Sequence, residues 1–104
     1  MDNIVERGQL YDYYGRMLTE HQQRIYEAVV YNDMSLSEIA DECDISRQGV
    51  HDLIKRCDKQ LAKYEDRLGL IARDREVQDI LDEIDELVKD DRAHVMTDKI
   101  RELL

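Results

Sequence analysis

Apolar residues recur at helical spacing along most of the chain, most clearly between residues 35 and 57. The first half of this stretch places apolar side chains three or four positions apart, at Leu36, Ile39, Ala40 and Cys43. The second half repeats the pattern at Val50, Leu53, Ile54 and Cys57. Because side chains at this spacing share one side of an α-helix, the stretch is predicted to form two amphipathic helices.

Polar residues mark where these two helices begin and end. Ser35 and Glu38 have the spacing of a capping box, in which each side chain bonds to the other residue's backbone N–H. Asp44 interrupts the pattern, and aspartate tolerates the left-handed conformation that a sharp turn needs. Ser46 is the predicted cap of the second helix. Two capped helices joined by a tight turn indicate a helix-turn-helix, although two plain core helices of a bundle would show the same stripes.

A helix is predicted before this motif, from about Asn3 to Leu18. Its apolar side carries Ile4, Leu10, Tyr14 and Leu18. We expect its tyrosines to pack this helix on the core with their hydroxyls reaching solvent. A stacking surface for nucleic-acid bases is the alternative. These tyrosines are Tyr11, Tyr13 and Tyr14.

A second helix is predicted to start at Thr19, which has capping-box spacing to Gln22. It should end in a turn at Asn32 and Asp33. Its inward-facing residues are Ile25, Val29 and Val30. Together with the two helices of the motif it would complete a three-helix unit from Thr19 to Lys59.

The helix that follows Ser46 is predicted to continue past the motif. Leu61, Tyr64 and Leu68 extend its apolar stripe to Gly69, which can end or kink a helix. A new stripe then predicts an acidic amphipathic helix with Val77, Ile80, Leu81, Ile84, Leu87 and Val88. Asp90 and Asp91 should break this helix. A short final helix would carry Val95, Met96, Ile100, Leu103 and Leu104.

The pattern therefore predicts two parts, a helix-turn-helix domain over residues 1–69 and an acidic amphipathic helical tail over residues 70–104. Two helices alone cannot bury all the apolar surface of this tail. We expect the tail to pack on the first domain or on a partner in a homodimer.

Composition favours an all-α fold. The 104 residues include no proline, no tryptophan, no phenylalanine and only four glycines, and no stretch alternates like a β-strand. The sequence contains no signal peptide and no apolar run long enough to span a membrane, so we expect a cytoplasmic protein.

Charge is distributed unevenly over the chain. The formal net charge of −10 argues against a general nucleic-acid binder. Residues 46–63 form the one basic segment, in which five Lys and Arg residues outnumber Asp52 and Asp58. This segment begins the second helix of the motif, whose first residues meet base edges in helix-turn-helix proteins. A merely solvated helix face is the alternative.

The candidate nucleic-acid contacts are the exposed residues of this helix: Ser46, Arg47, Gln48, His51, Lys55, Arg56 and Lys59. Arg47 and Gln48 offer paired donors that suit guanine and adenine. The three later cations are spaced to meet phosphates. Ser46 could donate to a phosphate, but we expect it to act as a cap. Gly49 would let another helix or a ligand backbone approach closely.

No residue pattern indicates catalysis. The sequence contains no glycine-rich phosphate loop, no zinc-ligand spacing and no nucleophile elbow. Cys43 and Cys57 fall on predicted buried faces, which indicates reduced core residues rather than a disulfide or a metal pair. His21, His51 and His94 do not stand at ligand spacing to either cysteine. We therefore predict neither an enzyme, nor a cofactor, nor a metal site.

The block LTEHQQRIYEAVVYNDMSLSEIADECDISRQGVHDLIKRCDKQLAKYE, residues 18–65, resembles region 4 of bacterial sigma factors. The whole chain is similar to the YlxM family of small bacterial helix-turn-helix proteins. This second resemblance rests on LYDYYGRMLT (residues 10–19), SLSEIADE (residues 35–42), ISRQGVHD (residues 45–52) and the acidic tail.

The resemblance implies a bacterial cytoplasmic regulatory protein, encoded beside the genes of the signal recognition particle and lacking cofactors and catalytic residues. Its implied role is to take part in that targeting pathway by binding the particle's protein or RNA components. The motif itself supports an alternative, a transcriptional regulator that reads double-stranded DNA in a sequence-specific way.

Overall fold

The all-α fold is confirmed. A computed structural model describes residues 4–104, in which six α-helices and one 3-10 turn occur and no strand is present. The chain divides into two compact units, one ending at Leu68 and the other beginning at Gly69. Asn3, the predicted start of the first helix, lies outside the described residues.

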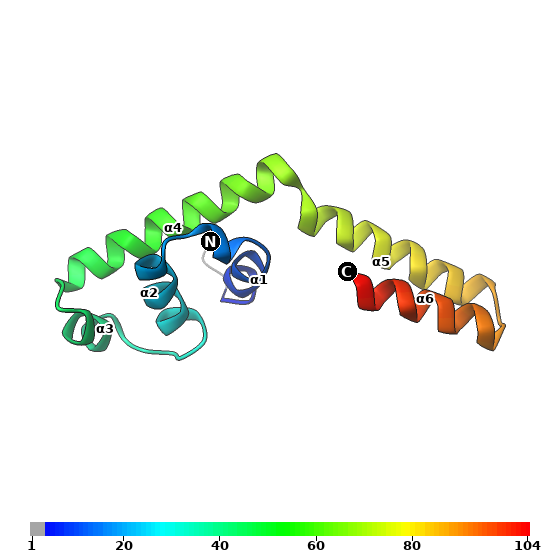
Figure 1. Cartoon of the computed structure of the whole chain (residues 1–104), viewed down its shortest axis with the longest axis horizontal. Helices are drawn as coiled ribbons and strands as arrows, with labels where there is room; N and C mark the ends of the chain where they lie inside the picture. Colours follow the sequence, from blue (N-terminus) through cyan, green and yellow to red (C-terminus); the bar gives the residue numbers. More distant parts are fainter. Residues whose placement is uncertain (1–3) are drawn as a thin grey trace. The chain divides into compact units, whose positions relative to one another are not determined.

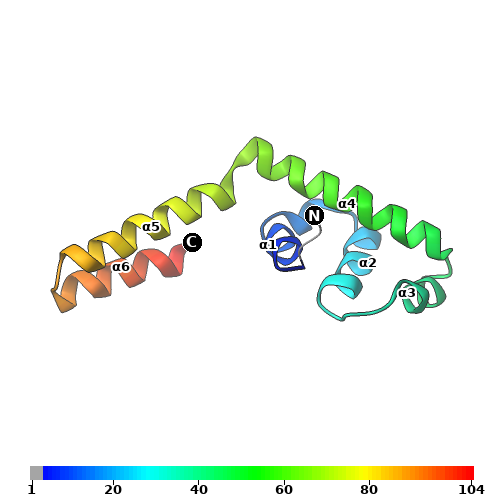
Figure 2. The same ribbon diagram turned by 180° about the vertical axis from the view of Figure 1, so that it is seen from behind.

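The first unit is built around its longest helix. It contains α1 (Ile4–Tyr14), the 3-10 turn η1 (Gly15–Met17), α2 (Glu20–Val30), α3 (Leu36–Cys43) and α4 (Arg47–Leu68). Helices α1, α2 and α3 all pack on α4, as Figures 1 and 2 show from opposite sides. The predicted three-helix unit is therefore present as α2, α3 and α4.

Both predicted capping boxes are confirmed. The Gln22 backbone N–H donates to the Thr19 hydroxyl at 3.2 Å, and the Thr19 N–H donates to the Gln22 side chain at 3.0 Å. The corresponding distances for Ser35 and Glu38 are 3.1 and 3.2 Å. Each box satisfies two donors that a helix N-terminus otherwise leaves unpaired.

The turn between α3 and α4 also has the predicted geometry. Asp44 adopts the left-handed conformation, with φ of 55°. The Ile45 N–H reaches back to the Ala40 carbonyl at 3.1 Å, which closes the helix end as a Schellman-type cap does. The Gly49 N–H donates to the Ser46 hydroxyl at 2.9 Å, so Ser46 caps α4.

A single apolar core fills the first unit beneath α4. Seven side chains in it are almost completely buried: Tyr14, Ile25, Tyr26, Ile39, Val50, Cys57 and Leu61. Two residues predicted on apolar faces are instead exposed, Ile4 by 53% and Leu68 by 54%. Ile4 lies in the first turn of α1 and Leu68 in the last turn of α4, where fewer neighbouring side chains are available to cover them.

Helix α1 ends earlier than predicted, because the chain tightens into η1 at Gly15. A Cβ atom at this position would lie only 2.7 Å from the Tyr11 ring. Glycine is therefore needed to let the ring lie across the backbone. Leu18, beyond η1, is 4% exposed, so its predicted inward orientation is confirmed although the helix stops before it.

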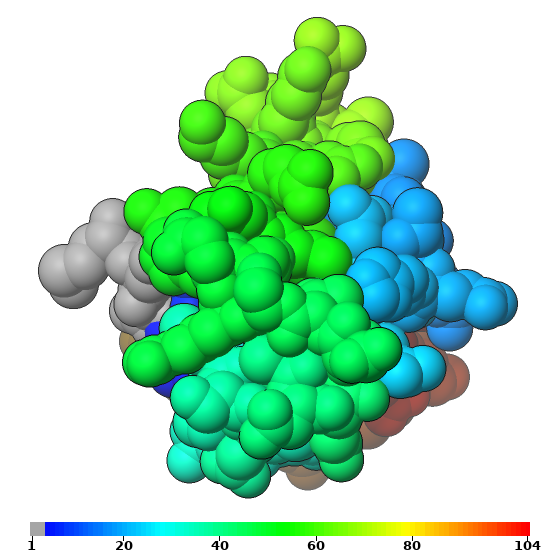
Figure 3. Space-filling model, turned by 90° about the vertical axis from the view of Figure 1, so that its left-hand side faces the viewer, coloured from blue at the N-terminus to red at the C-terminus, as the bar shows by residue number. Residues whose placement is uncertain are grey.

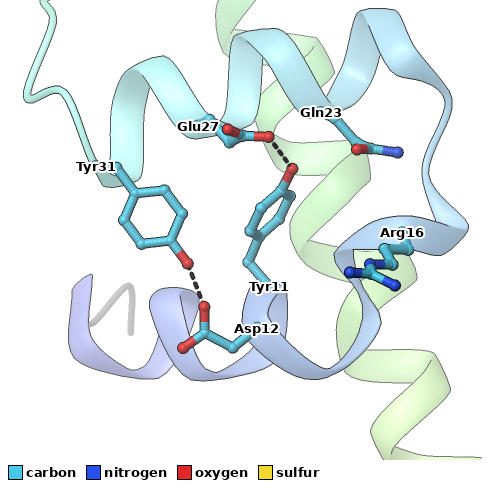
Figure 4. A pocket seen from close by; sticks show the side chains of 6 residues that line it. All are labelled: Tyr11, Asp12, Arg16, Gln23, Glu27 and Tyr31. Atoms are coloured by element: carbon cyan, nitrogen blue, oxygen red, sulfur yellow. Dashed lines mark hydrogen bonds between the residues drawn. The ribbon is translucent and has the colours of Figure 1, made fainter.

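The tyrosines of α1 anchor this helix to the unit rather than forming an open stacking surface. The Tyr11 ring stacks on Tyr26 with 5.5 Å between ring centroids. Its hydroxyl donates to Glu27 of α2, and Tyr31 donates to Asp12 of α1 in the same pocket (Figure 4). The Tyr14 hydroxyl donates to Glu65 of α4 at 2.5 Å. The expectation that these hydroxyls reach solvent was therefore wrong for Tyr11 and Tyr14, whereas Tyr13 is 38% exposed.

These contacts predict a loss of stability at alkaline pH. Burial and a hydrogen bond to Asp12 raise the pKa of Tyr31 to about 12, and burial likewise raises the pKa of Tyr11 and Tyr26 above 10. A tyrosine whose pKa is raised on folding contributes stability that is complete below about pH 10 and falls as the pH rises through the folded-state value. Urea midpoints followed by circular dichroism should therefore fall from pH 10 to 12, and less steeply in Tyr31→Phe. Equal slopes in both proteins would contradict this explanation.

The second unit is a hairpin of α5 (Leu70–Leu87) and α6 (Asp91–Leu103). Gly69 separates it from α4 with φ of 62°, so the predicted helix end at Gly69 is confirmed. Asp90 and Asp91 do not simply break a helix. The Asp90 side chain accepts the Arg92 N–H at 2.8 Å and caps α6, and Asp91 is the first residue of α6. Carboxylates are favoured at this position because they complement the helix dipole.

Polar contacts join the two helices of the hairpin along one edge. Arg101 of α6 donates to Asp85 at 2.7 Å and to Asp82 at 2.9 Å, and Thr97 donates to Asp85 at 2.6 Å. The hydrogen bonds from Thr97 and Arg101 hold the pKa of the Asp85 carboxyl below its ordinary value. Nowhere in residues 4–104 is a helix both long and apolar enough to cross a membrane.

Candidate nucleic-acid interface

The first turn of α4 presents three of the predicted contact residues at the surface. Arg47, Gln48 and His51 are exposed, and together with Leu36 of α3 they line a hollow. The Ser46 cap fixes where α4 begins, and the turn at Asp44 fixes how α3 lies beside it. Figure 3 faces this end of the unit, where α3 and the start of α4 are in view.

Asp52 organises two of these side chains. The Gln48 amide donates to Asp52 at 3.0 Å, and the His51 ring nitrogen Nδ1 lies 3.6 Å from the same carboxylate oxygen. Arg47 makes no ion pair or side-chain hydrogen bond within residues 4–104. The hollow therefore contains the Arg47 guanidinium, which can bind a ligand, beside the Gln48 amide and the His51 ring, which already contact Asp52.

Further along α4, the cations form a row on the exposed side. Lys55, Lys59 and Lys63 follow one another at four-residue steps, and each step turns about 40° round the helix axis. We call these three residues the lysine row. Arg47 and Arg56 are nine positions apart and lie about 180° from each other round the axis. The two arginines therefore lie on opposite sides of α4. No ion pair to the lysine row occurs among the described residues.

Asp58, one of the two acidic residues of this basic segment, is mostly covered and faces α1. Arg7 of α1 makes two hydrogen bonds to its carboxylate, at 2.7 and 3.2 Å, and the Tyr26 hydroxyl donates to it at 2.6 Å. Arg7 therefore neutralises this anion on the side of α4 that faces α1. Sequence reasoning missed Arg7, because a contact between positions 51 residues apart leaves no spacing signal.

The expectation for Gly49 was wrong in part. A Cβ atom built at Gly49 would lie 3.0 Å from the Ser46 hydroxyl and would meet no part of another helix within 4 Å. The glycine leaves room for the capping hydroxyl instead of a crossing helix.

The two cysteines, Cys43 and Cys57, are both at least partly covered by the first unit. Cys57 is buried, and burial raises its pKa to about 11, whereas Cys43 is only partly buried. Both thiols are free. Between Ile4 and Leu104, no cluster of histidine, cysteine and carboxylate side chains could hold a metal ion.

Two capped helices, a left-handed turn and an exposed first turn on the second helix define a helix-turn-helix protein. The chain belongs to the family described as "Putative helix-turn-helix protein, YlxM / p13 like", whose model matches residues 1–102. This confirms the resemblance to the YlxM family that the sequence showed.

Curated relatives match over most of the chain. A UPF0122 protein of Thermoanaerobacter sp. (strain X514) is 45% identical over 83 residues, covering 80% of this chain and 71% of its own length. One from Symbiobacterium thermophilum is 43% identical over 93 residues, with coverages of 89% and 85%. One from Clostridium kluyveri is 39% identical over 105 residues, with coverages of 97% and 94%.

Proposed function

We propose that this chain is a regulatory protein that takes part in the signal recognition particle pathway by binding the particle's RNA through α4. The family resemblance suggests the pathway. The observation that supports RNA as the component is the lysine row, Lys55, Lys59 and Lys63, on an otherwise acidic protein.

The chemistry of α4 fits an RNA duplex better than a base-reading surface. The deep, narrow major groove of A-form RNA excludes a helix, so proteins bind its phosphates and its shape from outside. The lysine row suits such contacts although it winds round the helix, because each ammonium is a mobile point charge on a flexible stem. The lysine row spans about 12 Å at 1.5 Å per residue, enough to meet several phosphates. The inward orientation of Asp58 keeps that anion out of the contact.

Titration of the labelled particle RNA with the full chain at several salt concentrations tests the proposal. In the variant Lys55→Glu/Lys59→Glu/Lys63→Glu, affinity should fall by at least tenfold, and the salt slope should decrease by about two to three, since each phosphate contact contributes about 0.7 to 0.9. The matched control is Arg16→Glu/Arg24→Glu/Lys89→Glu, which makes the same change of charge at exposed positions outside α4.

The control should bind as the original protein does. Equal losses in both triple variants would show that only net charge matters, and would overturn a role for α4. Binding to the particle's protein component with no affinity for its RNA would overturn the choice of RNA.

The second candidate is a transcriptional regulator, and the hollow lined by Arg47, Gln48 and His51 favours it. In this case random DNA duplexes selected by the protein should share a sequence motif. The variant Arg47→Ala/Gln48→Ala should lose preference for that motif while keeping its salt-dependent affinity. Selection that enriches no motif would exclude this candidate.

A further inference from the structure

The hairpin carries an apolar face that its own two helices, α5 and α6, leave exposed. Five large side chains on it are exposed: Ile80 by 50%, Leu87 by 78%, Met96 by 61%, Ile100 by 42% and Leu103 by 85%. Monomeric proteins rarely expose so many neighbouring apolar side chains, and such a face usually binds a partner.

The spacing of these residues is that of a helix-bundle seam. One apolar stripe on α5 has positions 77, 80, 84 and 87, and one on α6 has positions 93, 96, 100 and 103. Alternating steps of three and four residues are the pattern by which one helix packs lengthwise on another. We call these eight residues the hairpin face.

Both stripes lie on the same side of the hairpin. Thr97 and Arg101 point toward α5, where they bind Asp82 and Asp85. Each residue turns the helix by about 100°. On each helix the apolar stripe therefore lies about 90° round the axis from the side that contacts the other helix. Both stripes are turned away from the side that carries Asp82. One edge of the hairpin is thus closed by ion pairs, while the opposite edge is open and apolar.

We propose that the hairpin face packs against the same face of a second copy of this chain, forming an antiparallel four-helix bundle. In such a bundle the apolar stripes of all four helices face a shared core. Four-helix bundles commonly bury amphipathic helices in this way. A two-fold interface requires a self-complementary surface, so the charges that border the face decide whether a second copy fits.

Charges on the outer rims of the hairpin face favour one arrangement. Glu76 and Glu83 border the stripe of α5, and Arg92 and Lys99 border the stripe of α6. All four side chains are exposed and none has an ion-pair partner within residues 4–104. Stacking α5 on α5 would oppose carboxylate to carboxylate. Stacking α5 of one copy on α6 of the other places the glutamates of one copy opposite the cations of the other at both rims.

The register of the hairpin then selects a particular pair. Position 97 lies beside 85, and position 101 beside 82, so Lys99 lies level with Glu83 on the opposite rim. A two-fold axis parallel to the helices introduces no shift along them. It therefore places Glu83 level with Lys99 of the partner subunit, and the symmetry repeats this pair once more.

Molar mass measured by light scattering across a range of concentrations tests the apolar contact. The full chain should be a dimer at tens of micromolar, and Ile100→Glu should be a monomer. Val95→Glu is the matched control, because Val95 is similarly exposed, by 54%, but points away from the hairpin face. The control should remain a dimer. Circular dichroism must show equal helix content in both variants.

A charge exchange tests the register. Glu83→Lys and Lys99→Glu should each raise the dissociation constant of the dimer at least tenfold, because like charges then meet twice. The double variant Glu83→Lys/Lys99→Glu should restore it to within about threefold of the original. A monomeric original protein, or a dimer that Ile100→Glu leaves intact, would overturn the proposal. A double variant as weak as the single ones would overturn the paired register.

Discussion

Replacing Arg7 with alanine should lower the free energy of unfolding of the first unit by about 2 to 3 kcal/mol. Asp58 is then left in a mostly covered position without its cation, since only 22% of its side chain is exposed. The Tyr26 hydroxyl would remain the other donor to this carboxylate. Losses from broken buried pairs reach 3 to 5 kcal/mol, and partial exposure places this one at or below the low end of that range.

Urea unfolding of the full chain, followed by tyrosine fluorescence, measures this loss in the unit that contains all six tyrosines. The control is Arg56→Ala, which removes an exposed cation from α4 and should change the free energy by less than about 0.5 kcal/mol. If Arg7→Ala were as stable as Arg56→Ala, the pair with Asp58 would contribute nothing to the fold.

The same pair links stability to the proposed binding surface. Without Arg7, the carboxylate of Asp58 has no cation beside it and adds a negative charge about one turn from Lys55. Arg7→Ala should therefore weaken RNA binding only slightly, because its effect on the lysine row is indirect and screened by salt. Stability and binding can thus be separated by comparing this variant with the lysine-row variant.

Local signals carried most of what could be predicted from the sequence. Ser35, Asp44 and Ser46 act through hydrogen bonds and backbone conformation within a few residues, so their roles can be read from spacing alone. The apolar stripes located all the helices for the same reason. The early end of α1 escaped prediction, because it depends on Tyr11 lying across Gly15.

Tertiary contacts set the limits of the sequence-based prediction. The acceptors for Tyr11 and Tyr31, and the cation beside Asp58, come from other helices whose arrangement no spacing records. The candidate contacts on α4 were predicted as one group. Helix geometry separates them into a hollow at the first turn and the lysine row, with Arg56 beside the row, about 60° round the axis from Lys59. Which of these touches a nucleic acid stays a prediction.

Two isoleucines that look alike in the sequence should respond very differently to truncation. Both Ile4 and Ile25 were predicted on apolar helix faces, but Ile25 is completely buried and Ile4 is 53% exposed. Ile25→Ala should cost about 3 kcal/mol, since it removes buried methyl groups and leaves a cavity that packed neighbours cannot fully close. Ile4→Ala should cost less than about 0.5 kcal/mol.

Chemical denaturation of both variants, at protein concentrations that keep the oligomeric state constant, checks this difference. The two substitutions remove the same atoms from α-helices of the same unit, so any difference between them reports burial rather than side-chain chemistry. Alanine has a higher helix propensity than isoleucine, so this effect alone would stabilise both variants. The loss of stability expected for Ile25→Ala is therefore smaller than the packing contribution of the Ile25 side chain. Equal losses would mean that Ile4 is covered in solution, or that Ile25 does not lie in the core beneath α4.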